Sequence, residues 1–325
     1  MTVEISVVVP TFKRPQLLDR CLAALVAQTC DPAAYEIVIA DDAASESTRR
    51  QVEDWRNLCP QTGPGIHYLP VHDSHGPAAA RNAGWRFARG WVIAFTDDDC
   101  IPEPEWLAAG TRAIRDGATG VSGRVVVPLP EDPTDYERNA AGLATAEFVT
   151  ANCFYLRSAL EAVGGFDERF AMAWREDSDL WLTFMGRGET LVSAEDAVVV
   201  HPLRPAPWGV SLSQQRKSQY NALLYKKHPV LYRQRVQPGP PRDYYAIVAS
   251  IAGCLLGLGL RRPKITIASF VLWVRLTGTF IARRLHGTSR RPAHIAEIAV
   301  TSALIPPLAV YWRLRGAFTH RVRFL

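Results

Sequence analysis

The sequence lacks a cysteine pair with the spacing of a metal site or a redox motif. Its six cysteines are scattered through 325 residues, and no signal-peptide pattern precedes them. This scatter argues against a cysteine-ligated metal centre and indicates reduced thiols, with the catalytic part facing the cytoplasm. The cysteines are Cys21, Cys30, Cys59, Cys100, Cys153 and Cys254.

The first apolar run also lacks the glycine-rich turn of a dinucleotide-binding protein. Ile5 to Pro10 is a β-branched segment ended by proline, which is typical of a buried strand. No Gly-x-Gly-x-x-Gly follows it, so a dehydrogenase is disfavoured. Residues 11–15 (Thr-Phe-Lys-Arg-Pro) are a poor version of the triphosphate loop that a sugar-nucleotide nucleotidyltransferase needs, and that enzyme remains a second hypothesis.

Acidic residues are scarce towards the end of the chain. Residues 233–325 contain fourteen arginines and one lysine but only two carboxylates, Asp243 and Glu297, a formal charge of +13. Because the whole chain carries +5, residues 1–232 carry −8. The basic segment also holds apolar runs, so an anionic membrane surface fits it better than a nucleic acid. We therefore expect a catalytic domain over residues 1–232 and a basic, membrane-associated helical tail over residues 233–325.

Three apolar stretches in this tail are candidates for membrane helices. Tyr244–Leu260 has no formal charge and would be about 26 Å long as a helix. Ile265–Ala282 is interrupted by Arg275, and Ile298–Trp312 is broken by the proline pair 306–307. The intervening loops are all basic, so the positive-inside rule does not choose an orientation. Spanning helices or a hairpin, interfacial helices, and a buried helical subdomain all remain open.

Strand-length apolar runs alternate with helix-length segments through the first two hundred residues. This alternation predicts right-handed crossovers and a mainly parallel sheet with flanking helices, an α/β fold. The expected strands cover residues 5–10, 37–40, 66–69, 92–96, 120–127, 148–156 and 198–201. The expected helices cover residues 17–25, 46–56, 78–89, 107–116, 158–163 and 178–187.

Three adjacent carboxylates, Asp97 to Asp99, follow the apolar run 92–96. Neighbouring negative charges repel one another, so their clustering indicates a cationic partner, and a hard divalent ion is the natural candidate. The carboxyl end of a strand is also where α/β sheets bind ligands. A solvated acidic turn is the alternative, but a buried strand leading into the cluster weakens it. A second acidic pair, Asp41 and Asp42, follows the run 37–40.

Six short motifs occur in order over about residues 3–201. They are Val7 to Thr11, Ala40 to Asp42, Gly76 to Gly84, Phe95 to Pro102, Gly164 to Glu168, and Glu176-Asp177. In this order they resemble the motifs of family 2 glycosyltransferases, and six together are far more specific than any one alone. The resemblance implies a GT-A fold, that of nucleotide-diphospho-sugar transferases. It also implies a nucleotide-sugar half over about residues 1–107 and an acceptor half over about residues 108–232.

The resemblance implies a metal-dependent donor site. Asp97 and Asp99 match the family's Asp-x-Asp pair, whose oxygens hold Mg²⁺ or Mn²⁺ against the diphosphate of a nucleotide sugar. Asp98 is expected to contact the donor ribose. His201, at the end of the last expected strand, resembles a histidine that closes the metal or diphosphate site, although a lone histidine at a strand end is more often structural.

Five further residues match nucleotide-binding positions of the family. Asp42, with Asp41 beside it, corresponds to the residue that binds the base; capping of the following helix is the alternative. Pro10 and Thr11 lie where the family's backbone approaches the nucleotide, unless they are a plain strand terminus. Arg81 is expected to set a positive charge near the nucleotide, or to be a surface arginine paired with an aspartate. The family's usual Gly-Ser after the aspartate pair is Ala-Ala-Ser here, which leaves the base open.

Asp177 is the expected general base. In inverting transfer a carboxylate takes the proton of the acceptor hydroxyl, which attacks the anomeric carbon opposite the leaving nucleotide. Glu176 precedes it at an expected helix start, so helix capping is the alternative for this pair, and Asp179 is a weaker alternative base. Glu176 and Trp174 are assigned to the acceptor side, where Trp174 stacks on a sugar ring unless it packs in the core.

The sequence thus predicts an inverting, metal-dependent hexosyltransferase at the cytoplasmic face of the cell membrane. Residues 214–217 read Gln-Gln-Arg-Lys and lack the tryptophan of the processive members' Gln-x-x-Arg-Trp motif, which favours transfer of a single sugar. The expected partners are a nucleotide-diphosphate sugar (a UDP-sugar by default), a lipid-linked or glycan acceptor of the cell envelope, and the membrane. A silent membrane protein that binds a nucleotide sugar is a third hypothesis, against which the intact Asp177 argues.

Overall fold

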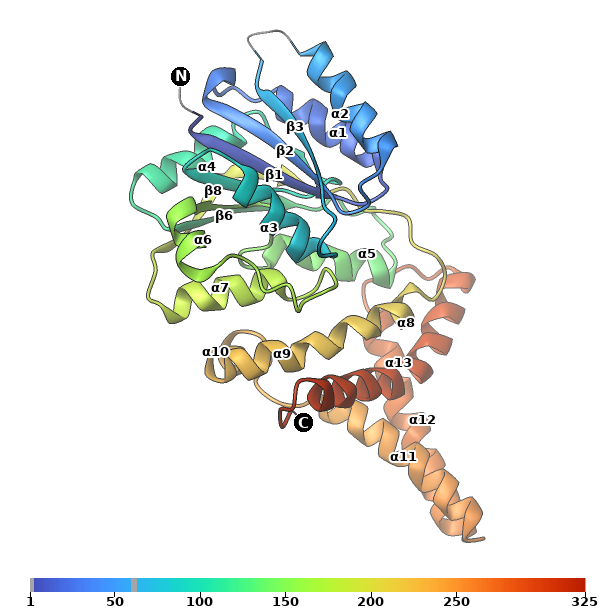
Figure 1. The fold of residues 1–325 in the computed structure, drawn as a ribbon. Coiled ribbons are helices and arrows are strands. Elements are labelled where there is room, and N and C mark those ends of the chain that lie inside the picture. Colours follow the sequence, from blue (N-terminus) through green and yellow to red (C-terminus); the bar gives the residue numbers. More distant parts are fainter. Residues whose placement is uncertain (1–2, 60–62, 325) are drawn as a thin grey trace. The chain divides into compact units, whose positions relative to one another are not determined.

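The computed structural model describes residues 3–59 and 63–324 (Figure 1). The chain forms two compact units, one of Met1–Pro128 and Ala141–Leu203, the other of Leu129–Ala140 and Arg204–Leu325. The division at residue 203 comes before the one expected at 232, because the helices that follow Leu203 pack against the last helix of the chain. Whether the catalytic domain ends at residue 232 stays a prediction.

An eight-stranded mixed sheet with the order β3-β2-β1-β4-β7-β6-β8-β5 organises the first unit. The first four strands in that order pair in parallel, β7 runs antiparallel between β4 and β6, β8 is parallel to β6, and β5 is antiparallel to β8. The strands are β1 (Ile5–Thr11), β2 (Tyr35–Asp41), β3 (Gly65–Pro70), β4 (Val92–Phe95), β5 (Ile101–Pro102), β6 (Gly120–Val126), β7 (Cys153–Leu156) and β8 (Leu191–Val200).

Helices flank this sheet, so the expected α/β fold is confirmed. Along β1, Val7 and Val9 join the core that contains Leu18 of α1, whereas Val8 on the other face meets Gly84 of α3. A Cβ at Gly84 would lie 2.4 Å from Val8, so only glycine lets α3 approach β1 this closely. The helices of this unit are α1 (Pro15–Val26), η1 (Pro32–Ala34), α2 (Glu46–Leu58), α3 (Pro77–Phe87), α4 (Trp106–Arg115), η2 (Ala141–Thr145), α6 (Arg157–Val163) and α7 (Glu176–Gly186).

The described part of the second unit is helical (Figure 1). The last helix runs unbroken through Pro306 and Pro307, where the sequence predicts a break; Pro306 is buried, and packing against the preceding helices holds this segment helical despite its missing hydrogen bonds. The helices are α5 (Asp135–Ala140), α8 (Val210–Gln214), η3 (Gln215–Gln219), α9 (Tyr220–Lys227), α10 (Pro229–Arg235), α11 (Arg242–Gly259), α12 (Pro263–Leu285) and α13 (Pro292–Thr319).

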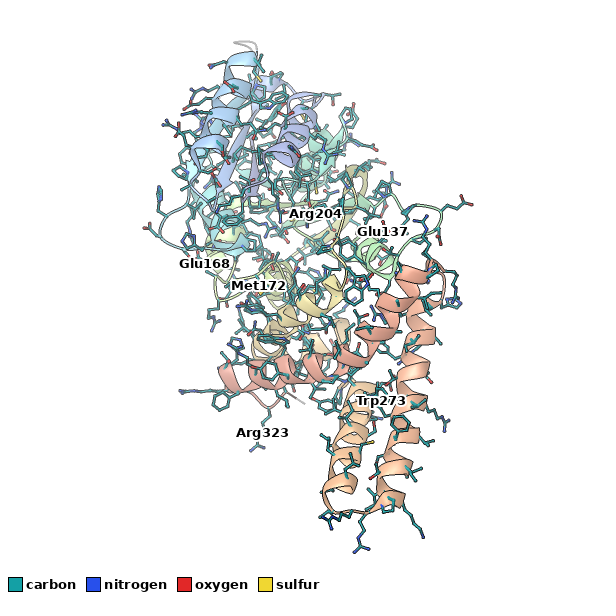
Figure 2. All side chains as sticks on the ribbon, turned by 90° about the vertical axis from the view of Figure 1, so that its right-hand side faces the viewer. Glu137, Glu168, Met172, Arg204, Trp273 and Arg323 are labelled. Carbon is teal, nitrogen blue, oxygen red and sulfur yellow. The ribbon has the colours of Figure 1, made fainter. Side chains whose placement is uncertain are left out.

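Two of these helices are long and apolar enough to cross a membrane. They are α12, with a mean hydropathy of 1.7, and α13, with 1.5. Only 11% of the apolar window of α12 is buried, against 39% for α13, so α12 presents most of its apolar surface outward. Figure 2 shows α11 and α12 side by side as a hairpin, with Trp273 near the middle of α12. This weakly favours membrane association and does not choose between spanning and lying on the surface.

Candidate active site

The carboxyl ends of β1, β2 and β4 bring the predicted donor residues to one edge of the sheet. Parallel register places Thr11 beside Asp41, and the β4 strand ends just before the acidic turn Asp97 to Asp99. The Thr11 hydroxyl donates to Asp98 Oδ2 at 2.8 Å, and Arg14 Nη1 lies 3.1 Å from Asp98 Oδ1. Burial raises the pKa of Asp98 to about 6, against the opposing effect of Arg14.

Asp98 therefore ties the acidic turn to the end of β1, and its contact with a donor ribose stays a prediction. Arg14 was not among the expected site residues. Its signal in the sequence is the basic pair Lys13-Arg14 shortly after the first strand, which belongs to the poor triphosphate-loop pattern of residues 11–15. Pro10 sits at the same strand end, half-buried and paired with Ala40.

The two aspartates after β2 differ in what they can offer a ligand. Asp41 is fully buried, and its carboxylate accepts hydrogen bonds from the backbone N–H groups of Ala43 and Ser45 at 3.0 and 2.8 Å. Asp42 is partly exposed, with Oδ1 3.0 Å from His75 Nδ1 and Oδ2 2.9 Å from the N–H of Gly76. This arrangement gives Asp41 a turn-forming role and favours Asp42 as the carboxylate offered to a base.

Arg81 joins the donor side of the site to the acceptor side. It is buried, not on the surface, and Nη2 donates to Asp97 Oδ1 at 2.6 Å while Nη1 donates to Glu176 Oε1 at 3.1 Å. The two carboxylates raise the pKa of the guanidinium further, against the effect of burial, so it stays charged. One fixed positive charge thus balances carboxylates from two parts of the chain that are distant in sequence.

The neighbouring Asn82 explains why the Gly164–Glu168 motif accompanies α3. Its amide donates to the carbonyl of Phe166 and to Glu168 Oε1, both at 2.8 Å, and its Oδ1 accepts from the N–H of Phe166. Gly165 has φ +81°, and a Cβ there would lie 2.5 Å from Asn82 Oδ1. Hydrogen bonds and close packing therefore hold the Gly76–Gly84 and Gly164–Glu168 motifs against each other.

The acidic turn and the end of β8 meet in a geometry that suits a divalent ion. Asp99 Oδ1 and His201 Nε2 are 3.6 Å apart, too far for a good hydrogen bond. Two ligands each about 2.1 Å from one ion lie roughly 3–4 Å apart, so this spacing fits. His201 Nδ1 is buried and finds no hydrogen-bond partner among the described residues, so the imidazole is not held by a structural hydrogen-bond network.

Cys100 completes a cluster with Asp99 and His201 whose candidate ligand atoms all lie within 4.8 Å of one another. Burial and the adjacent aspartates raise the pKa of the Cys100 thiol, so it stays protonated and is a poor ligand for a hard ion. Asp99 and His201 are accordingly the residues of this cluster that suit Mg²⁺ or Mn²⁺. The predicted role of Asp97, whose carboxylate lies 2.6 Å from Arg81, stays a prediction.

Asp177 lies in the first turn of α7, where its Oδ1 accepts from the N–H of Ser178 at 2.6 Å. Burial raises its pKa, which keeps the carboxylate basic. The adjacent Glu176 is buried, its Oε2 has no partner in the described part of the chain, and burial together with Asp177 raises its pKa to about 7. Two carboxyl groups of raised pKa side by side are a common feature of acid–base sites.

Trp174, which the sequence assigns to the acceptor side, is exposed to solvent. Its side chain is 39% exposed, and the Arg175 guanidinium lies 4.7 Å from the ring centroid. The sequence left core packing open for this tryptophan, and the exposure argues against it. Arg175 adopts φ +79° at the start of α7, which turns the chain sharply before Glu176.

The raised pKa of Glu176 predicts that the stability of the protein depends on pH. Native Glu176 keeps a proton that the unfolded chain releases between pH 4.5 and about 7, so the free energy of unfolding should fall as the pH rises through that range. Glu176→Gln removes this titration, and the variant should gain stability relative to the wild type across the range. Urea unfolding at several pH values measures the difference. The control Glu161→Gln changes an exposed carboxylate of α6 and should show the same pH dependence of the free energy of unfolding as the wild type. If Glu176→Gln also showed the wild-type pH dependence, native Glu176 would not hold this proton.

Comparison with known proteins supports the resemblance to glycosyltransferases that the sequence motifs indicate. The model of the family described as "Glycosyl transferase family 2" matches residues 6–179. Glycosyltransferase AglE from Haloferax volcanii is 26% identical, over 62% of this chain and 67% of its own length. A validoxylamine A glucosyltransferase from Streptomyces hygroscopicus subsp. limoneus is 35% identical over 32% of this chain, a region that spans only 22% of that protein.

A solved structure agrees on the fold. Mannosyltransferase PcManGT from Pyrobaculum calidifontis, in complex with GDP-Man and Mn²⁺, has a TM-score of 0.56 and 18% identity, covering 99% of this chain and 88% of that one. At this identity the likeness shows the GT-A fold alone. The matched family residues make up more than half of the 325, and they include the acidic turn, Arg81 and Asp177. The chain therefore belongs to the family 2 glycosyltransferases.

Proposed function

We propose that this glycosyltransferase transfers a single sugar, with inversion, from a nucleotide sugar to a lipid-linked or cell-envelope acceptor at the cytoplasmic membrane face. The observation that carries the proposal is the Arg81 bridge. Arg81 bonds both Asp97, which we assign to the metal side, and Glu176, which we assign to the acceptor side, and Asp177 is adjacent in sequence. This contact supports a single site for the donor-binding and proton-accepting groups, as a single displacement step requires.

In this proposal each residue acts on one part of the reaction. Asp42 binds the base, and Asp98, held by Thr11, orients the ribose. Asp97, Asp99 and His201 would hold a divalent ion, which would neutralise the negative charge of the leaving diphosphate. Asp177 accepts the proton of the acceptor hydroxyl, and Trp174 supports the sugar ring by stacking.

The donor and the metal are supported by a neighbour. The mannosyltransferase of similar fold is described as a complex with GDP-Man and Mn²⁺. A UDP-sugar remains the default expectation for this chain, and a guanosine donor is the first alternative. The membrane placement rests on the basic tail and on the outward apolar surface of α12.

A donor screen tests the proposal. We expect the purified full-length protein with Mn²⁺ to hydrolyse one class of nucleotide sugar slowly, releasing the nucleoside diphosphate and a sugar of inverted anomeric configuration. Proton NMR follows the anomer, and chromatography follows the nucleotide. A retained anomer would contradict inversion. Pyrophosphate release from a nucleoside triphosphate and a sugar phosphate, with no donor hydrolysis, would instead support the nucleotidyltransferase.

A further inference from the structure

A basic hollow in the second unit has no role in the proposed transfer. It has a volume of about 760 Å³ and lies between the start of α11, the end of α12 and the short helix α5. All of its lining residues belong to this one unit. Its basic lining residues are Arg138, Arg242, Arg283, Arg284 and His286.

Arg284 is the buried arginine of the hollow, whereas Arg138 is exposed. The Arg284 side chain is only 9% exposed; it lies 2.6 Å from Asp135 and donates to the Thr301 hydroxyl at 2.7 Å. Arg138 donates to the backbone carbonyl of His286. A buried guanidinium with several partners is held in place, so it presents a fixed positive charge.

The other two arginines are available at the surface of the hollow. Arg242 is exposed, and Arg283 forms an exposed pair with Asp243 at 2.8 Å, a kind of contact that contributes little and is easily exchanged. An entering phosphate could replace the Asp243 carboxylate on Arg283 and gain the fixed charge of Arg284. The four arginines outnumber the two lining carboxylates, which suits an anion.

The hollow lies at one end of an apolar hairpin. α11 has 18 residues and α12 has 23, so the pair is roughly 27–35 Å long, close to the thickness of a bilayer's hydrocarbon core. Gly253 and Gly257 form a Gly-x-x-x-Gly seam against Ser269 and Thr266, where a Cβ on Gly257 would lie 2.7 Å from the Thr266 nitrogen. The large apolar side chains therefore point away from the seam, among them the exposed Leu255, Leu256, Leu258, Ile267 and Val271.

Aromatic rings mark the level of the hollow along this hairpin. Tyr244 and Phe280 line it and contact each other edge to face, with centroids 5.4 Å apart. The guanidinium of Arg283 lies 5.8 Å from the Phe280 centroid. Aromatic and basic side chains gather where a membrane helix meets the headgroups. At the other end of the hairpin, Arg261, Arg262 and Lys264 form a second basic level.

We infer that the hollow binds the phosphate of an anionic lipid headgroup. With the hairpin in a bilayer, the hollow lies at the depth of lipid phosphates, and basic pockets between membrane helices recognise such headgroups. Its volume admits a headgroup, and the outward side chains of α12 contact the acyl chains. The inference rests on the membrane placement in the proposed function, not on the transfer chemistry.

Vesicle flotation of the full-length protein tests this. The double variant Arg242→Gln/Arg283→Gln should bind vesicles of phosphatidylcholine with phosphatidic acid at least about tenfold more weakly than the wild type, because each arginine near an anionic membrane contributes roughly fivefold. The matched control Arg290→Gln/Arg323→Gln removes two exposed charges of the same unit outside the hollow. Its loss of vesicle binding should be less than half of the loss in the first double variant. Figure 2 labels Arg323, away from the hairpin.

Three arms separate the sources of the phosphate. Vesicles that carry an isoprenoid phosphate in place of phosphatidic acid test whether the hollow binds an acceptor lipid. Inorganic phosphate tests whether it binds a free anion. The inference is supported if Arg242→Gln/Arg283→Gln alone binds either kind of lipid vesicle more weakly than the wild type. Equal losses in both double variants would show general surface attraction and overturn it, as would a difference seen with inorganic phosphate alone. Donor hydrolysis in detergent should be unchanged in both variants, so a failed donor screen and a failed lipid test are distinguishable.

Discussion

Asp177→Asn should lower the rate of sugar transfer by roughly 10²–10⁴-fold, because the variant keeps the shape of the side chain but cannot accept the acceptor's proton. Donor binding should change little, since Asp177 lies beside Glu176 and not among the residues assigned to the nucleotide. Steady-state transfer and calorimetric donor binding, measured on the same preparation, separate these two effects. Transfer at the wild-type rate would remove Asp177 from the mechanism.

Asp179→Asn is the matched comparison for this result. Asp179 occupies the same first turn of α7 and is the alternative base. It is buried, and its charge interacts with the Arg169 guanidinium, so its role is expected to be structural. The variant should lose stability in thermal unfolding but retain most of its rate per folded molecule. A full loss at Asp179 with normal transfer by Asp177→Asn would reverse the assignment.

Removing divalent ions should abolish transfer, and Asp99→Ala should weaken Mn²⁺-dependent UDP binding by at least roughly 10–100-fold. The estimate follows from the cost of disturbing even the outer contacts of a metal site. Asp99 faces His201 at 3.6 Å without a good hydrogen bond, so the alanine removes one of three candidate ligands. Titration calorimetry of UDP with and without Mn²⁺ measures the change.

The comparison variant is Asp116→Ala, which removes an exposed carboxylate at the end of α4 in the same unit. It should bind UDP and Mn²⁺ as the wild type does. Restored transfer after Mn²⁺ is added back to the EDTA-treated wild type would exclude denaturation as the cause of the loss. Full transfer in excess chelator would count decisively against a metal-assisted reaction.

The parallel half of the sheet was predictable because its signals are local. β1, β2 and β4 each contain an apolar run of three or four residues, and proline or acidic residues follow these runs. The second half was less predictable. β5 has two residues and exists only because β8 offers it an edge. β8 extends back to Leu191 because residues 191–194 also pair with β6, on the far side of a register irregularity at residues 195–197. Such pairing depends on strands that are distant in sequence, so a local stretch of sequence does not predict it.

For the candidate site, the motifs gave the residue types but not their partners. The sequence matched Asp42 to the base with Asp41 beside it, and only the structure shows that the Asp41 carboxylate is already occupied by the backbone N–H groups of Ala43 and Ser45. It placed Arg81 near the nucleotide or on the surface, whereas the structure buries it between Asp97 and Glu176. Those partners lie 16 and 95 residues away, so they depend on how α3 and α7 meet the sheet.

The Arg81 bridge also has a consequence for redesign. One guanidinium contacts both Asp97 and Glu176, which we propose to lie beside the leaving group and the general base, so a change to either carboxylate should affect the other through their shared counter-charge. Engineering a new metal or donor preference at Asp97 would shift the acidity of Glu176 and move the pH optimum of the enzyme. Under this proposal, metal preference and working pH are coupled, so variants at Asp97 should be screened at several pH values.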